Sequence, residues 1–467
     1  MLYCEYIYIY MHIHMHYCIR AYVPQLLPQW LGLAPVPDID TSKPQKPQWD
    51  LEHWTPIAIT SFSENPKYQM CKLNFRAYSV GGPNKTPMFK DLLAASQCKG
   101  NNLKSMRLSE IKKEMEMEES AGKPKSIMIP PTGFVFHESR VGSTLVANLL
   151  GTDPFNMVFS ESAPPASVLM NCRGCSHQDQ VDRFRDTVLA MGRSPTHKRV
   201  FFKFQSITAT AMKIALEAFP DTPWVFIYRD PVQTMMSHMD PDKGGGRNAN
   251  CLKSKKKPSE KFKEIMTTSG LDKMSSAPKE AVCAAHLNML CECALEALEE
   301  YGTYDSDPER SRGLLIDYKF LPGAVPTVLL PHFGLTETPA KSLLQSMAKE
   351  SLQYSKGSSR NSKRGKTGVF TGDSADKERR SSVAIDDWSK KIMGPTYEKM
   401  NALSLPVLES LSRGVTLDAI SVIPGSENFA TASEEESQVT LSTFAYEPFT
   451  NTHNSSRYEV DTLPFFC

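Results

Sequence analysis

The sequence predicts an α/β fold in which a parallel sheet is covered by helices. Three observations support this prediction. Short apolar runs rich in β-forming residues alternate with helical patterns between Gly133 and Tyr318, which is the order expected of strand–helix–strand units. Two of these runs, 133–136 and 224–228, end at a polar turn that opens a helix. The chain of 467 residues is also long enough for a sizeable core and for two or three domains.

Each predicted element follows from a local pattern. The run Gly-Phe-Val-Phe at 133–136 is continuously apolar, as in a strand buried on both faces, and helix-spaced apolar residues follow from Leu145. Strand and helix patterns then continue to alternate. Further strands are expected at 199–204, 224–228 and 313–318, and further helices at 179–191, 208–219, 281–301 and 340–352.

The regions around the predicted sheet differ in composition. Residues 1–48 combine a low-complexity leader, in which Tyr, Ile, Met and His alternate, with a proline-rich linker. Residues 49–120 form an accessory region, which is either a separate domain or extra elements packed on the sheet. Its strand patterns lie at 57–62 and 71–78 and its helix patterns at 88–96 and 103–119. The sheet domain is expected over 125–425, with a mobile lysine-rich surface insertion at 241–277, and the acidic tail at 426–467 is predicted to be disordered.

The turn after the first strand has the features of an anion site. It reads Arg140-Val141-Gly142-Ser143-Thr144 and leads directly into a helix. A helix N-terminus has unpaired N–H groups and partial positive charge, so it binds phosphate or sulfate. Gly142 allows close approach, the two hydroxyls donate hydrogen bonds and Arg140 adds charge. The loop lacks the lysine of the triphosphate-binding P-loop, and alone it is equally compatible with an ordinary strand-to-helix turn.

A second turn adds a matching feature. The strand pattern 224–228 ends at Arg229, and Pro231 stands where it can open a helix. Ser237 follows Arg229 by eight residues, about two helical turns. Both side chains are therefore able to face one anion if the strand end and the helix fold back together.

The two segments together resemble the sulfotransferases that use 3′-phosphoadenosine 5′-phosphosulfate (PAPS), over about 127–318 of this chain. The resemblance implies a P-loop fold and PAPS as co-substrate, without a metal. In that family a Lys/Arg-Ser-Gly-Ser/Thr-Thr loop holds the 5′-phosphosulfate, and here the loop reads Arg140-Val141-Gly142-Ser143-Thr144, with Val in the place of the first Ser. An Arg at a strand end with a Ser eight residues later, matched by Arg229 and Ser237, holds the 3′-phosphate.

The resemblance also suggests catalytic roles. Arg140 would stabilise charge on the leaving group. Many members use a His as base at the end of the next strand, but here the segment reads Lys203-Phe204-Gln205, and Gln cannot accept the proton. Members that act on protein tyrosines, and some that act on sugars, use a Glu about twenty residues after the basic residue. Glu161 lies at that spacing and follows an apolar segment, so we assign it as the base, with Lys203 reaching the sulfate or the acceptor.

A later basic stretch is open to two interpretations. Residues 353–380 are rich in Ser, Lys, Arg and Gly, which is typical of a solvated loop. Family members also close a late basic loop over the 3′-phosphate, and Arg364-Gly365-Lys366 is similar to that loop. We therefore include these three residues among the candidate nucleotide ligands.

Cysteine and charge patterns restrict other functions. Cys172 and Cys175 have the spacing of half a zinc site or of a redox pair, and no second Cys-x-x-Cys completes four ligands. Metal binding, a loop disulfide and two free thiols remain open for this pair. Cys291 and Cys293 are expected to pack as small apolar residues of a helix. The formal net charge is only +1, and without a basic face bearing groove-reading elements we do not expect nucleic acid as a partner.

The sequence therefore predicts an enzyme that moves a sulfuryl group from PAPS to a hydroxyl or amine of a small-molecule, glycan or protein acceptor. The alternatives are a non-catalytic nucleotide-binding or scaffold protein and a P-loop phosphotransferase. The acceptor, the oligomeric state and the compartment, Golgi lumen or cytosol, stay open. The leader fits neither a signal peptide nor a membrane anchor, because it lacks an early basic patch and an apolar run of about twenty residues.

Overall fold

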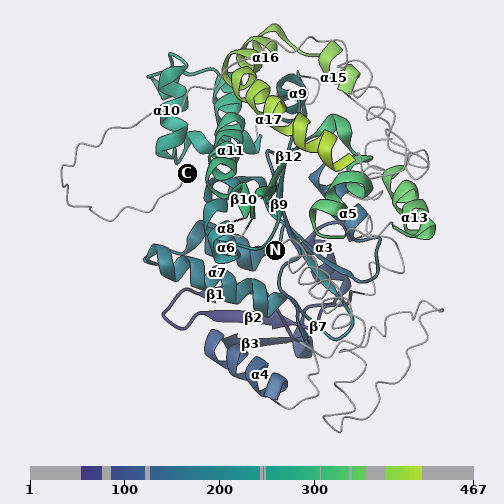
Figure 1. Cartoon of the computed structure of the whole chain (residues 1–467). Helices are drawn as coiled ribbons and strands as arrows, with labels where there is room; N and C mark the ends of the chain where they lie inside the picture. Colours follow the sequence, from purple (N-terminus) through teal and green to yellow (C-terminus); the bar gives the residue numbers. More distant parts are fainter. Residues whose placement is uncertain are drawn as a thin grey trace, which may run out of the picture. The chain divides into compact units, whose positions relative to one another are not determined.

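The computed structural model describes residues 54–75, 86–120, 127–241, 246, 249–304, 307–335, 339–353 and 374–412. Its centre is a five-stranded sheet with the strand order β12-β9-β5-β8-β6. Figure 1 labels β9 and β12 of this sheet. All neighbouring strands are parallel, so the predicted α/β fold is confirmed. The strands are β5 (Gly133–His137), β6 (Asn156–Ser160), β8 (Arg199–Lys203), β9 (Trp224–Tyr228) and β12 (Gly313–Asp317).

The sheet is buried on both faces, and the central three residues of each strand are apolar. Successive side chains of a strand point to opposite faces. Phe134 and Phe136 of β5 accordingly belong to one hydrophobic core, and Val135 belongs to the other. Such continuous apolar runs are typical of parallel sheets with helices on both sides.

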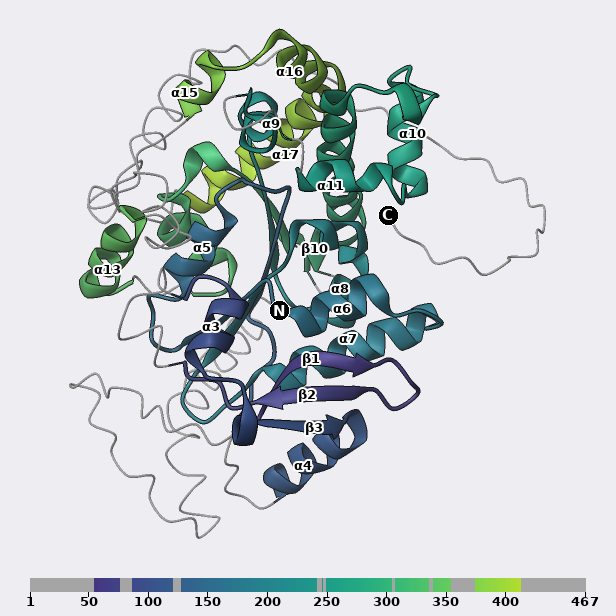
Figure 2. The same ribbon diagram turned by 180° about the vertical axis from the view of Figure 1, so that it is seen from behind.

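Helices cover the two faces in two groups, which the opposite views of Figures 1 and 2 separate. The side of Val135 packs against α5 (Ser143–Leu150), α12 (Leu330–His332) and α13 (Lys341–Ser351). The other side packs against α6 (Ala163–Asn171), α7 (His177–Met191), α8 (Met212–Ala218), α9 (Pro231–Met239) and α11 (Lys279–Tyr301). The helix expected at 208–219 is divided, because a 3-10 helix, Ser206–Ala211, precedes α8.

Shorter elements complete the described part. Strands β4 (Ile127–Met128) and β7 (Arg193–Ser194) pair with each other, as do β10 (Thr303–Tyr304) and β11 (Asp307–Ser311). Near the C-terminal end of the described chain lie α15 (Ser374–Arg379), α16 (Val383–Trp388) and α17 (Gly394–Ser412). The remaining turns are 3-10 helices at Met274–Ser276 and Tyr318–Phe320 and π-helical segments at Val325–Leu329 and Ser389–Met393.

The accessory region packs on the sheet domain. It consists of β1 (Thr55–Ser61), β2 (Lys67–Cys71), α3 (Phe89–Ala95), the 3-10 helix Gly100–Asn102, β3 (Leu103–Arg107) and α4 (Leu108–Ser120). The hydroxyls of Tyr68 in β2 and Thr187 in α7 lie 2.7 Å apart, and a disulfide joins Cys71 to Cys98. Two expectations were wrong. The strand pattern at 71–78 fails because β2 ends at Cys71, and the helix expected at 103–119 starts only after β3.

The lysine-rich insertion differs from the mobile surface segment that was predicted. Within its described residues, a 3-10 helix, Asn250–Lys255, and α10 (Glu260–Thr268) pack on α11. Phe262 and Ile265 of α10 are buried, and a disulfide joins Cys251 to Cys283 of α11. The prediction failed because the many lysines masked an amphipathic apolar face.

Helix α11 passes between the sheet and this insertion. It is long and apolar enough to span a membrane, but 78% of its most apolar stretch is buried inside the protein, as expected of a core helix. Cys291 is buried and free in this helix. Cys293 is buried in the hydrophobic core, as expected of a small apolar residue, and it is also disulfide-bonded.

Candidate active site

Predicted site residues lie at the carboxyl ends of four of the five strands. In the order of the sheet, the ends of β9, β5, β8 and β6 carry Arg229, the loop before α5, Lys203 and Glu161, and Tyr318, which was not predicted, follows β12. Carboxyl ends of parallel strands lie at one edge, and ligands of open α/β sheets bind outside this edge where the strand order reverses. The reversal occurs here around β5, since later strands were added on both of its sides.

The loop before α5 has an unusual backbone conformation. Ser139, Arg140 and Gly142 have φ angles of 147°, 62° and 78°, which residues other than glycine rarely adopt. Gly142 is the N-cap of α5 and no side chain caps the helix. Among the described residues, no acceptor pairs with the backbone N–H groups of Ser143 and Thr144. The strained turn therefore presents free donors at a positive helix end, while the Arg140 side chain is exposed.

The ring of Tyr318 joins the two predicted anion sites. A Cβ atom added to Gly142 would lie 2.9 Å from two ring carbons of Tyr318. The guanidinium carbon of Arg229 lies 3.9 Å from the centre of the same ring. The requirement for glycine at position 142 is therefore both conformational and steric, and the two sites are separated by about one aromatic side chain.

Arg229 is buried and held by several partners. Its Nε donates to Oε1 of Gln233 over 2.7 Å, and its Nη2 donates to the hydroxyl of Ser374 in α15 over 2.8 Å. The Ser237 hydroxyl donates to the Gln233 carbonyl over 3.0 Å. Residues four apart lie on one helix face, so Ser237 shares the face of α9 that carries Gln233. Gln233 thus lies between the two residues that the sequence paired.

Glu161 and Lys203 form an ion pair at the ends of neighbouring strands. The Nζ atom of Lys203 donates to Oε1 of Glu161 over 2.5 Å, and the N–H of Glu161 donates to the Lys203 carbonyl over 2.6 Å. The lysine side chain is 1% exposed and the glutamate side chain 28% exposed. Burial lowers the pKa of Lys203, and the carboxylate of Glu161 opposes this shift. Glu161 has a left-handed φ of 58°, which turns the chain sharply after β6.

Several residues near the site were not predicted. Gln233 had a sequence signal, because it stands midway between Arg229 and Ser237. Ser374 had none, since it lies 145 residues from its partner Arg229. Glu138 was passed over as part of a polar turn, yet it is 1% exposed.

The remaining candidates have separate outcomes. Arg364, Gly365 and Lys366 lie outside the described residues. Cys172 and Cys175 are joined by a disulfide, which decides between the three states left open for this pair. Across the described ranges, no three His, Cys, Asp or Glu side chains gather as metal ligands.

Comparison with known proteins adds little to this geometry. No family model and no curated protein matches the chain. Among solved structures, the sulfotransferase domain from the curacin biosynthetic pathway is similar with a TM-score of 0.32 and 14% identity. The match covers 58% of this chain and 98% of that domain. A likeness of this size does not assign a family, so the function is argued from the residues of the site.

Proposed function

We propose that this chain is a PAPS-dependent sulfotransferase that acts on a hydroxyl of a carbohydrate or peptidyl acceptor. One observation carries the proposal: the same Tyr318 ring lies where a Cβ atom of residue 142 would be and beneath the guanidinium of Arg229, so it adjoins both predicted anion sites. This separation suits one small molecule with phosphate groups at both ends. The Glu161–Lys203 pair lies farther along the same edge, where an acceptor would meet the donor.

In the proposed complex each anion site has its own donors. The N–H groups and hydroxyls of Ser143 and Thr144, with Val141 and Gly142 shaping the loop, would hold the 5′-phosphosulfate. Arg229 and Ser237 would hold the 3′-phosphate, together with the basic residues at 364–366. A guanidinium donates two parallel hydrogen bonds to a phosphate, which fixes its orientation as well as its charge.

The chemistry assigned to the chain is proton removal and charge stabilisation. Glu161 would accept the proton of the acceptor hydroxyl as its oxygen forms a bond to sulfur. The bond from sulfur to the 5′-phosphate oxygen breaks in the same step, releasing adenosine 3′,5′-bisphosphate. Arg140 would stabilise the charge on that leaving oxygen. Lys203 orients the Glu161 carboxylate in the free protein and would reach the transferred group in the proposed complex.

The disulfides favour an oxidising compartment such as the Golgi lumen. Cys71–Cys98 and Cys251–Cys283 connect separate elements of the fold, and such bonds persist where thiols are not kept reduced. Mass spectrometry of the alkylated, unreduced protein from its native compartment checks this part of the proposal. Free thiols at both pairs would contradict it.

The decisive experiment is transfer of radiolabelled sulfate from PAPS to a panel of glycans, peptides and phenols. We expect labelled product with the wild type and none with Glu161→Gln, while both proteins bind adenosine 3′,5′-bisphosphate. Binding without transfer to any acceptor would favour the non-catalytic alternative. Transfer of phosphate from ATP, without binding of the bisphosphate, would favour a phosphotransferase and refute the proposal.

A further inference from the structure

Glu138 is a buried carboxyl at the site that the proposed chemistry does not use. Its N–H donates to the Ile227 carbonyl over 3.0 Å, and its Oε2 accepts from the N–H of Arg229 over 3.3 Å. Main chain and side chain of Glu138 together hold the end of β9. They fix the backbone from which the Arg229 side chain extends over Tyr318.

The second oxygen of this carboxyl, Oε1, is buried and accepts no hydrogen bond from the described residues. Burial raises the pKa of Glu138 well above its usual value, the Arg229 N–H and charge oppose this, and Asp230 and Asp317 add to it. The shift favours the protonated acid, which has one O–H to donate in addition to its acceptor positions.

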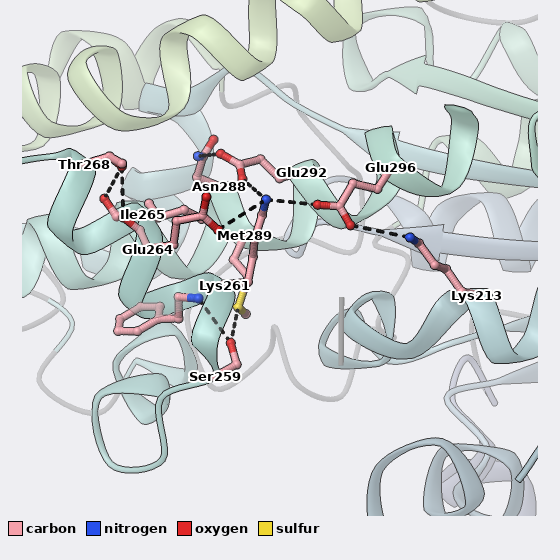
Figure 3. Close-up of polar contacts among 11 residues, drawn as sticks. Lys213, Ser259, Lys261, Glu264, Ile265, Thr268, Asn288, Met289, Glu292 and Glu296 are labelled. Carbon is pink, nitrogen blue, oxygen red and sulfur yellow. Dashed lines mark hydrogen bonds and ion pairs between the residues drawn. The ribbon is translucent and has the colours of Figure 1, made fainter. Parts of the chain in front are cut away.

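A second unpartnered oxygen lines the same small cavity. Asn288 of α11 is 3% exposed, and its Nδ2 donates to Oε1 of Glu292 over 2.8 Å (Figure 3). This bond fixes the orientation of the amide, and Oδ1 of Asn288 is left buried with no hydrogen-bond partner in the part of the chain that the structure describes. Glu138 and Asn288 both line a cavity of about 10 Å³, which has room for about one water molecule. Buried polar oxygens of this kind are usually satisfied by ordered water.

We propose that Glu138 and Asn288 bind one water molecule between the loop after β5 and α11, and that Glu138 is a positioning residue for Arg229 through the hydrogen bond that its Oε2 accepts. The role toward the 3′-phosphate rests on the proposed function, whereas the water does not. The network continues beyond Asn288, because Glu292 pairs with Lys261 of α10 over 3.0 Å (Figure 3). The candidate nucleotide site is thus tied to the described part of the insertion.

The raised pKa of Glu138 makes the stability of the fold depend on pH. Its contribution to the free energy of unfolding is fully present below the unfolded-state pKa of 4.5 and is lost as the pH rises through the higher pKa of the folded state. Glu138→Gln cannot titrate, so it removes this slope. The groups that face Glu138 are Asp230, the N-cap residue of α9, Asp317 of β12, Cys291 of α11, Tyr397 of α17, and Tyr228 and Arg229 at the end of β9.

The test compares Glu138→Gln, Glu138→Ala and Asn288→Leu with the wild type. Glu260→Gln is the matched control, since Glu260 is 88% exposed. A high-resolution crystal structure locates the water, thermal unfolding across pH reports the slope, and calorimetry gives the affinity for adenosine 3′,5′-bisphosphate. Glu138→Gln keeps an acceptor for the Arg229 N–H, whereas Glu138→Ala leaves it unpaired, so we expect roughly tenfold weaker binding in the alanine variant only.

The outcomes separate the inference from the proposed function. A water between the two oxygens, a flattened pH slope in Glu138→Gln and weakened binding in Glu138→Ala support the inference. An empty cavity overturns the water site, and wild-type affinity in Glu138→Ala overturns the positioning role. A wild type that binds no bisphosphate overturns the proposed function, while the crystal structure and the pH slope still decide whether Glu138 and Asn288 form the network.

Discussion

The two members of the Glu161–Lys203 pair are expected to tolerate replacement very differently. Their gross attraction at 2.5 Å is on the order of 7 kcal/mol at an effective dielectric constant of about 20. Much of this is offset by the desolvation of the lysine, because several kcal/mol are lost for each buried ion. The lysine side chain is 1% exposed and the glutamate side chain 28% exposed, so the lysine carries most of the desolvation cost.

Glu161→Ala therefore leaves an unpaired ammonium in the interior. We expect it to lower the free energy of unfolding by about 3 kcal/mol, near the lower end of values for broken buried pairs. Lys203→Met removes the buried charge and leaves a carboxylate that water reaches, so its stability should lie within about 1 kcal/mol of the wild type. The double variant should recover most of the loss caused by Glu161→Ala, which a double-mutant cycle measures.

Urea unfolding, monitored by tryptophan fluorescence, measures these differences in the free energy of unfolding. The pH dependence of the same free energy is a second measurement. Burial already lowers the pKa of Lys203, and loss of Glu161 lowers it further. Between the folded pKa and the unfolded value of 10.5 the folded protein binds fewer protons, so stability rises with pH. The deficit of Glu161→Ala should therefore shrink as pH rises. Equal destabilisation by Lys203→Met and Glu161→Ala would refute the reasoning.

Three further variants, one of them with a matched control, test other parts of the site and fold. Gly142→Ala should lose about 1–3 kcal/mol of stability and weaken bisphosphate binding. The control Gly174→Ala has a similar φ of 75° but no atom within 4 Å of its added Cβ, so it should show the cost of the backbone conformation alone. Equal effects of the two variants would exclude the steric role of Tyr318. Arg229→Lys should weaken bisphosphate binding at least tenfold in calorimetry because the paired donor geometry is lost, and unchanged affinity would place the 3′-phosphate elsewhere. Lys261→Met should lower the melting temperature most at low salt, since its ammonium lies 3.0 Å from each of two carboxylates of α11; a loss independent of salt would point to packing instead.

The sequence specified the strands and the turns that follow them. Apolar runs such as 133–136 and 224–228 became β5 and β9 with small changes at their ends. Pro231 opens α9 as expected, and Asp230 caps it by accepting from the Gln233 N–H over 2.9 Å. These features are local, because a strand, a cap or a proline acts through residues a few positions away. A prediction from local composition was wrong at 241–277. The composition suggested a mobile segment, whereas packing on α11 stabilises a helix there.

Only the tertiary structure decided which of these residues meet. The salt bridge between Glu161 and Lys203 joins residues 42 positions apart, and it exists because β6 and β8 are neighbours in the sheet. Tyr318 comes between Gly142 and Arg229 because β12 lies beside β9. Strand order and burial are set by the packing of the whole chain, whereas periodicity and capping are set by a few adjacent residues. The sequence therefore identified the residues at the two anion sites, and the fold determined how far apart they lie. The fold also determined that Oε1 of Glu138 and Oδ1 of Asn288 are buried with no hydrogen-bond partner among the described residues.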